Sequence, residues 1–335
     1  MCTDRRAGLG TAAVLAFASA CNGTTSYLDA TGRAGRHEAR LGIWLTAVAG
    51  AVVLLVIIAI VAGIARRRDD GEATGRREVR GGLAWIYWGV AATVVVLIAT
   101  FGGTMATLDA ASRPPTTPAV TLDVTGHQWW WEVRYRDAAG TDLGFVTANE
   151  VHLPVGEPVR VRLQSADVIH SFWLPQIAGK TDAIPGQVNE MWLQADRAGT
   201  SRGPCGEYCG MQHANMTIAV TAESPAAFRA WEAARRAESV APTSEEALTG
   251  RAVFTRSCGA CHAVEGTSAL GRVGPDLTHL ASRPFIGAGA LENTPASLAR
   301  WIPNAPAVKE GARMPAMPLS PAELRDVVAY LETLR

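Results

Sequence analysis

The stretch Cys205–Met216, CGEYCGMQHANM, places two cysteines, a histidine and a methionine within twelve residues. Three interpretations compete: a disulfide between the cysteines, a structural zinc site, and a copper site. A disulfide leaves His213 and Met216 without a role. Zinc sites use thiolate, imidazole and carboxylate ligands rather than thioether sulfur. Copper accepts thiolate, imidazole and thioether together in electron-transfer sites, so copper fits the whole set.

Two cysteines on one loop indicate more than one copper ion, because a mononuclear blue-copper site uses a single cysteine. If both thiolates bridge a pair of ions, each ion also needs an imidazole, and the loop supplies only His213. His170, in VIHSFWLP after an alternating segment, is the preferred second histidine. His127 and His152 are its rivals.

Two long apolar stretches lie upstream of this loop. No Asp, Glu, Lys or Arg occurs in 41–65 or in 81–108. Each stretch exceeds the roughly 20 residues that a helix needs to cross a bilayer, so spans are predicted at about 41–65 and 83–108. The intervening loop, 66–82, is rich in arginine (Arg66, Arg67, Arg68, Arg76, Arg77 and Arg80). The positive-inside rule places this loop in the cytoplasm and everything after the second span outside it.

The beginning of the chain resembles a secretion signal, predicted at 1–20, with Arg5 and Arg6 before the apolar run LGTAAVLAFASA. Two processing routes are open: cleavage after ASA, and lipidation of Cys21, which we prefer. Residues 21–40 then form an extracytoplasmic segment. With Cys2 in the signal and Cys21 set apart, the remaining cysteines form two close pairs outside the cytoplasm. The net charge of +0 gives no support for a nucleic-acid partner.

Residues 117–222 are typical of short strands. The segments VTLDVT and VRVRL alternate, and Gly, Pro and Asp separate them from NEMWLQA and MTIAVTA. This pattern predicts a small antiparallel sandwich or barrel. A helix and linker follow at 223–242, with Ser224 as N-cap and Pro225 in the first turn.

Residues 243–335 have helical patterns. Capping boxes are predicted for Thr243 with Glu246 at the first helix, and for Ser320 with Glu323 at the last. The first of these helices ends at a C-x-x-C-H motif, described next.

Cys258-Gly-Ala-Cys261-His262 predicts covalent attachment of haem, with the histidine as proximal ligand of the iron. A thioredoxin-like pair needs a βαβ setting, and a zinc knuckle needs a second pair nearby; neither is present in the sequence. Met314 and Met317, in GARMPAMP, are the candidates for the distal ligand. The Pro275 carbonyl is placed to orient His262, and Trp301 has two readings, a propionate partner or a core residue.

Residues 243–335 resemble class I cytochromes c. In that family the distal ligand is the methionine of a Met-Pro pair before the last helix. The resemblance therefore favours Met314, with Met317 as the alternative.

Four motifs occur in order behind the two apolar stretches: GHQWWWEVRY, VIHSFWLP, GKTDAIPG and CGEYCGMQHANM. Together they resemble subunit II of cytochrome c oxidase over about 25–235. With the haem motif, the chain resembles the bacterial form that carries a fused cytochrome c. The resemblance implies a multidomain membrane protein: a two-helix transmembrane hairpin (41–108), a cupredoxin-like Greek-key β-barrel (117–222) and an all-α cytochrome c domain (243–335).

The family's copper ligands match residues of this chain. The resemblance implies a dinuclear copper A centre held by His170, Cys205, Cys209, His213, Met216 and the backbone carbonyl of Glu207. It also implies a magnesium ion reached by the Glu207 side chain at the interface with subunit I. Electrons would enter this domain at Trp129, while packing is the expected role of at least one of Trp129, Trp130 and Trp131.

The resemblance further implies a role in a bacterial plasma membrane, with both cofactor domains outside. An upstream donor, either a cytochrome c or a quinol–cytochrome c reductase complex, would reduce the haem. Copper would pass electrons to subunit I, in a complex with subunits I and III that reduces oxygen and pumps protons. Lys180 and Asp182 would lie near that route. The chain would thus be the electron-transfer subunit of an oxidoreductase whose oxygen site is on another chain.

Two features depart from the family pattern. Trp130 stands where tyrosine is common, and Glu78 is the only acid near the start of the second span, where many members have a glutamate that feeds a proton channel. Two other functions are alternatives. A quinol oxidase subunit II shares the scaffold but lacks copper ligands, and a membrane-anchored copper-delivery protein does not require a haem motif or a tryptophan run.

Overall fold

The computed structural model describes residues 23, 25–69 and 82–335. The predicted signal peptide, Cys2, Cys21 and Glu78 lie outside the described residues. The chain divides into two compact units. One consists of Arg36–Arg113, and the other of the residues up to Gly35 together with Pro114–Arg335.

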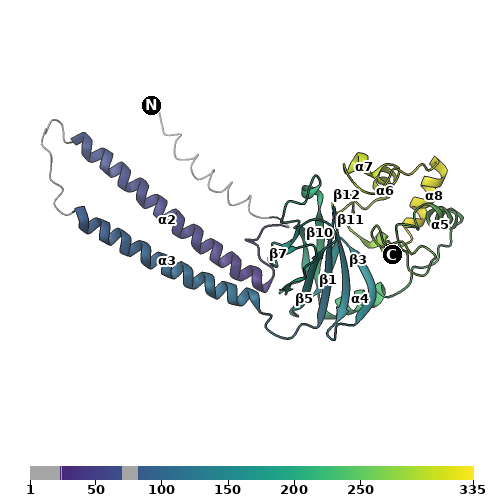
Figure 1. Cartoon of the computed structure of the whole chain (residues 1–335), viewed down its shortest axis with the longest axis horizontal. Helices are drawn as coiled ribbons and strands as arrows, with labels where there is room; N and C mark the ends of the chain where they lie inside the picture. Colours follow the sequence, from purple (N-terminus) through teal and green to yellow (C-terminus); the bar gives the residue numbers. More distant parts are fainter. Residues whose placement is uncertain (1–22, 24, 70–81) are drawn as a thin grey trace, which may run out of the picture. The chain divides into compact units, whose positions relative to one another are not determined.

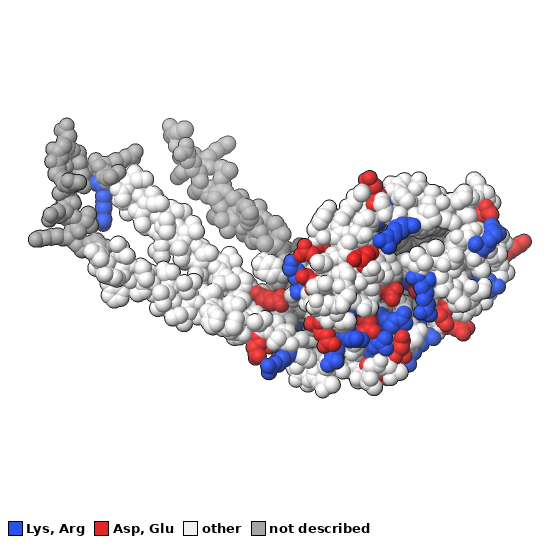
Figure 2. Space-filling model, in the orientation of Figure 1, with Lys and Arg blue, Asp and Glu red and all other residues white. Residues whose placement is uncertain are grey.

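The first unit is built from two long helices, α2 (Arg33–Asp69) and α3 (Gly82–Ser112), which run side by side in opposite directions (Figure 1). Their apolar windows have mean hydropathies of 3.0 and 2.0, and none of either window is buried within the protein. Figure 2 shows no acidic or basic group along the middle of either helix. Both helices extend beyond the predicted spans, because backbone hydrogen bonding continues through the polar turns at their ends. Part of the predicted 21–40 segment and loop is therefore helical.

The β domain contains ten strands among the described residues. They are β1 (Val120–His127), β2 (Trp130–Asp137), β3 (Asp142–Ala148), β4 (Glu150–Pro154), β5 (Val159–Ser165), β6 (His170–Leu174), β7 (Ala178–Ala183), β8 (Asn189–Leu193), β9 (Gly199–Pro204) and β10 (Thr217–Glu223). One sheet has the order β3-β2-β1-β5-β8, a second has the order β4-β10-β9, and β6 pairs with β7.

The sheets are mixed, which corrects the expectation of an antiparallel domain. The pairs β1–β5 and β4–β10 are parallel, and the other strand pairs of these sheets are antiparallel. Alternation along a strand predicts which side chains are buried but not the direction of its neighbour. In β1 the alternation holds along the whole strand, and Leu122 and Val124 are fully buried in the core between the sheets.

The helix α4 (Pro225–Arg235) begins as predicted, with the Ser224 side chain accepting from the N–H of Ala227. The cytochrome-like domain follows. It has the helices α5 (Glu245–Ser257), α6 (Pro295–Trp301), α7 (Ala305–Val308) and α8 (Pro321–Leu331), and a small hairpin of β11 (Phe285–Ile286) and β12 (Leu291–Glu292).

The two predicted capping boxes have different outcomes. The box of Ser320 and Glu323 is confirmed at α8. The box of Thr243 and Glu246 is wrong, because Ser244 is the N-cap of α5 and accepts from the N–H of Ala247. Both residues are capping types, so the local sequence did not distinguish the two registers. Helix α5 ends at Ser257, with Cys258 as its C-cap, so it ends at the C-x-x-C-H motif as predicted.

Candidate metal centre

The loop Cys205–Met216 joins β9 to β10, and its two ends are tied together. The N–H of Cys205 donates to the carbonyl of Met216 at 2.9 Å. The N–H of Gly206 donates to the carbonyl of Ser171 at 2.8 Å. The backbone of Cys205 also forms an isolated antiparallel β-bridge with that of Phe172. These bonds hold the loop against β6, the strand that begins with His170.

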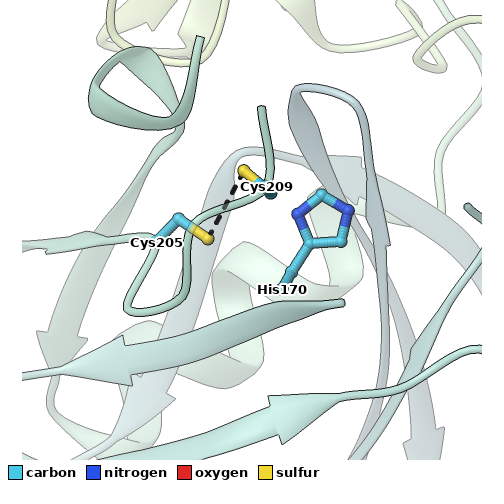
Figure 3. Close-up of side chains that lie close together, drawn as sticks. All are labelled: His170, Cys205 and Cys209. Atoms are coloured by element: carbon cyan, nitrogen blue, oxygen red, sulfur yellow. Dashed lines mark hydrogen bonds between the residues drawn. The ribbon is translucent and has the colours of Figure 1, made fainter. Parts of the chain in front are cut away.

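Three buried side chains converge there. The ligand atoms of His170, Cys205 and Cys209 all lie within 4.8 Å of one another (Figure 3). Cys209 Sγ lies 3.9 Å from Cys205 Sγ, 3.7 Å from His213 Nδ1 and 3.9 Å from Met216 Sδ. The carbonyl oxygen of Glu207 is 3.3 Å from Cys205 Sγ. All six predicted positions are therefore gathered around one point.

The two cysteines are free thiols, and their 3.9 Å separation is far longer than the ~2.05 Å of a disulfide bond. The hydrogen bond between the two thiols is the largest cause that lowers the pKa of Cys205, and the same bond raises the pKa of Cys209. One thiol of the pair is thus prepared to ionise. Thiolate is the form that binds metals.

His170 is oriented by a residue that the sequence analysis missed. Asp167 Oδ1 lies 2.9 Å from His170 Nε2, while the buried Nδ1 has no hydrogen-bond partner in the part of the chain that the structure describes. Burial acts to raise the pKa of Asp167, but hydrogen bonds from His170 and from the N–H groups of Gln128 and Val168 lower it on balance. A carboxylate on one ring nitrogen leaves the other free to bind a metal. The donor set therefore fits copper, and the spacing D-x-x-H was the available signal.

The rival histidines are engaged elsewhere. His152 Nδ1 lies 2.7 Å from Glu223 Oε1, and its ring stacks on Trp231. The ring of His127 stacks on Trp130 with centroids 4.3 Å apart. Neither belongs to the group formed by His170 and the cysteines.

Asp167→Asn is expected to weaken copper binding about 10–100-fold, the usual effect of removing an outer-shell partner of a ligating histidine. In the wild-type protein the N–H of Gln128 donates to Asp167 Oδ2 at 2.7 Å. The side-chain amide of asparagine would also place an N–H donor near one of the donors that Asp167 accepts from. Competition with a copper chelator measures the affinity. The matched control is Asp142→Asn, at the exposed side of β3, which should bind copper as wild type does. Equal affinity of the two variants would contradict the assigned orientation of His170.

The tryptophan run has three different environments. Trp131 is fully buried and packs edge-on against His170 and Phe172, which confirms a packing role for one member. Trp130 stacks on His127. Trp129 is only partly buried, and its Nε1 donates to the carbonyl of Cys209 at 3.0 Å.

A largely apolar cavity occupies the cytochrome-like domain. Its lining includes Cys258, Cys261, His262, Trp301, Met314 and Met317. His262 Nδ1 lies 2.8 Å from the Pro275 carbonyl, so the predicted orienting contact is confirmed and the other ring nitrogen is left for a ligand. Cys258 and Cys261 are free. The cavity, the two thiols and the oriented imidazole fit a covalently attached haem.

The remaining predicted residues are accounted for as follows. Both methionines border the cavity, and Met317 also packs against the hydrophobic core of the domain. Trp301 is packed against the same core. Lys180 Nζ donates to the Gly206 carbonyl at 3.3 Å, and the Asp182 carbonyl accepts from the Asn189 side chain at 2.8 Å.

Comparisons with known proteins identify related families for both domains. Residues 140–223 match the family "Cytochrome C oxidase subunit II, periplasmic domain", and residues 247–335 match the family "Cytochrome c". Among solved structures, the periplasmic domain of subunit II of cytochrome oxidase (CoxB) of Bradyrhizobium japonicum is similar, with 34% identity and a TM-score of 0.34. That match covers 36% of this chain and 96% of the solved one.

Two relatives extend over most of the chain. Cytochrome c oxidase subunit 2 of Alkalihalophilus pseudofirmus is 36% identical over 302 residues, which cover 88% of this chain and 85% of the relative. That of Bacillus sp. (strain PS3) is 31% identical and covers 74% and 73%. With its apolar helices, its β-sandwich and its C-terminal haem-type domain, the chain belongs to the cytochrome c oxidase subunit 2 family and carries a cytochrome c domain.

Proposed function

We propose that this chain is the electron-accepting subunit of a respiratory terminal oxidase. In this proposal, the haem of the C-terminal domain passes electrons to a dinuclear copper A centre on the loop Cys205–Met216. One observation carries the proposal. Trp129 borders the haem cavity and also donates a hydrogen bond to the carbonyl of Cys209, a residue of the metal cluster. A single side chain thus contacts both sites.

The chain's own residues would hold the two groups. His170, Cys205, Cys209, His213 and Met216 would supply copper ligands from their side chains, and Glu207 would supply its backbone carbonyl. Cys258 and Cys261 would attach the haem, and His262 and Met314 would be the protein ligands of its iron. When bound, the two groups would supply one-electron redox chemistry to the chain.

Most of the proposed copper ligands are tightly packed and shielded from water. Trp131 is fully buried against His170 and Phe172, so the ring of the histidine is held by packing as well as by Asp167. Cys209 and Met216 are buried too, which keeps water from the thiolate and thioether sulfur atoms. A rigid, dry site lowers the structural rearrangement that accompanies electron transfer.

The partners follow from the family. The relatives are subunits of cytochrome c oxidases, which supports assembly with subunits I and III and delivery of electrons to an oxygen-reducing, proton-pumping site on subunit I. The Glu207 side chain is the proposed magnesium contact at that interface, and Lys180 and Asp182 lie near the proposed route. The donor to the haem is a cytochrome c or a quinol–cytochrome c reductase complex. Two apolar helices and an extracytoplasmic domain suit the bacterial plasma membrane.

The test compares two tryptophans in the full chain, loaded with copper and haem within the oxidase complex. Photochemical reduction of the haem is followed by the absorption change of copper. Trp129→Leu is expected to slow this transfer roughly tenfold or more, equivalent to ~1.4 kcal/mol of activation free energy. Trp130→Leu is the control, because Trp130 stacks on His127 instead of bonding to the copper loop.

Two results would contradict the proposal. Haem reduction in the wild-type complex that is never followed by copper reduction would remove the relay itself. Equal slowing by both leucine variants would remove the role of Trp129 and leave only general packing.

A further inference from the structure

The haem domain is docked on the β domain through directed polar contacts. The N–H of Thr217, at the start of β10, donates to the carbonyl of Ala288 in the β11–β12 turn at 2.9 Å. The guanidinium of Arg202 lies over the ring of Phe285, 5.2 Å from its centroid. These contacts place the turn of the haem domain beside the end of the metal-binding loop.

Lys309 lies at the centre of this interface. It follows α7, and its N–H donates to the carbonyl of Ala305 at 2.9 Å, which fixes its backbone. The residue is 4% exposed. Its ammonium donates to three carbonyls: Trp129 at 2.8 Å, Asn215 at 2.7 Å and Gly287 at 2.8 Å. Two of these acceptors belong to the β domain and the third to the haem domain.

The residue type is informative. Of the 31 lysines and arginines in the chain, 29 are arginines and two, Lys180 and Lys309, are lysines. An ammonium is a compact group with three donors, whereas a guanidinium is a flat fork suited to carboxylates and phosphates. Three carbonyls that converge on one nitrogen match the ammonium.

The buried charge makes the contact selective for the docked arrangement. Burial lowers the pKa of Lys309 to about 8, while the nearby Cys209 acts to raise it. All three ammonium donors have acceptors, so the charge is buried at the lowest penalty only when both domains supply their carbonyls. Separation of the domains removes two acceptors at once.

The segment that Lys309 anchors reaches the aromatic contact between the two sites. Gly311 lies so close to Trp129 that a Cβ at this glycine would be 3.1 Å from the indole Cη2 atom. Met314, the proposed axial ligand, follows three residues later. Arg313 Nη2 lies 3.7 Å from Oδ2 of Asp167, the residue that orients His170. The residues 309–314 therefore join the haem cavity to the surroundings of the copper ligands.

We propose that Lys309 is a positioning residue that locks the haem domain onto the β domain through the carbonyls of Trp129, Asn215 and Gly287, and so holds the segment 309–314 against Trp129. The inference rests on the proposed electron relay and adds the element that fixes its geometry. Lys309 itself borders the haem cavity, but it is not one of the proposed ligands. It acts through the backbone of the residues beside them.

The test uses the complete oxidase complex with loaded subunit II, in wild type and in the variants Lys309→Met, Lys309→Gln and Arg300→Met. Arg300→Met is the control, because it also replaces a cation of the haem domain by methionine but at an exposed position. Hydrogen exchange of the peptide containing Thr217 reports docking. Haem-to-copper transfer after photoreduction reports positioning, and redox titration verifies that both potentials are unchanged.

In Lys309→Met, exchange at Thr217 is expected to become roughly tenfold faster, the change that ~1.4 kcal/mol of lost docking free energy produces. The transfer rate should fall by about the same factor, because transfer is fast only in the docked state. Lys309→Gln, with two donors, should be intermediate, and Arg300→Met should match wild type.

The proposal is overturned if hydrogen exchange of the Thr217 peptide in Lys309→Met is as slow as in wild type. It is also overturned if exchange becomes faster while the haem-to-copper transfer rate is unchanged. If Lys309→Met does not assemble, Lys309→Gln decides by the same two criteria. A wild-type complex that shows no haem-to-copper transfer would instead refute the relay. In that case, exchange at Thr217 still reports whether Lys309 docks the domains.

Discussion

Cys209→Ser is expected to eliminate the copper pair and leave at most a single bound ion. Cys209 Sγ lies within 3.7–3.9 Å of three other candidate ligand atoms. These belong to the thiol of Cys205, the imidazole of His213 and the thioether of Met216. Serine retains the size of the side chain but offers a hydroxyl, which is a poor ligand for copper compared with thiolate. With one thiolate left, two ions cannot both be bridged.

The measurement is copper content together with electron paramagnetic resonance of the full chain. Wild type should show hyperfine splitting from one electron shared by two copper nuclei, and Cys209→Ser should show splitting from a single nucleus or no copper signal. Met211→Leu is the matched control within the same loop, because Met211 is 61% exposed and outside the cluster. A shared-electron spectrum that survives in Cys209→Ser would contradict the bridging role.

Most of the metal centre follows from local sequence because its residues lie on one short loop. A backbone hydrogen bond from the N–H of Cys205 to the carbonyl of Met216 closes this loop. In the closed loop, the sequence spacing determines which side chains meet: Cys205, Cys209, His213 and Met216. His170 was chosen among three histidines by its position after a strand, and the structure brings that one to the loop. The C-x-x-C-H motif is equally local.

The features that the sequence did not reveal depend on long-range pairing. The direction of β1 relative to β5 is set by the path of the whole domain, so the alternation of each strand was compatible with either direction. The contact of Lys309 with Trp129 joins residues 180 positions apart. Nothing near Lys309 in the sequence distinguishes a buried, triply bonded ammonium from an exposed one.

The connection between the two domains changes how the haem domain is understood. Residues 247–335 match the cytochrome c family, but the β11–β12 turn and the segment after α7 also contact the β domain, through Ala288 and Lys309. In the proposed relay, a tethered donor that is also docked would present its haem cavity to Trp129 continuously. Diffusional encounter would then be needed only for reduction of the haem.

Met314→Leu is expected to lower the reduction potential of the haem by on the order of 0.2 V, within the ~0.8 V span that axial ligands control. Methionine paired with histidine raises the potential of a cytochrome c, because the thioether stabilises the reduced iron. Both Met314 and Met317 border the cavity, so lining alone does not separate them.

Met317→Leu is the matched control, and its expected result differs because of its packing. Met317 lies against the hydrophobic core of the domain, and its N–H donates to the Pro303 carbonyl at 3.0 Å, so leucine should lower stability by less than ~1.5 kcal/mol and leave the potential unchanged. Redox titration of the haem absorption in the full chain measures both variants. A potential that falls in Met317→Leu but not in Met314→Leu would reverse the assignment, and it would mean that the segment anchored by Lys309 shields the haem without ligating it.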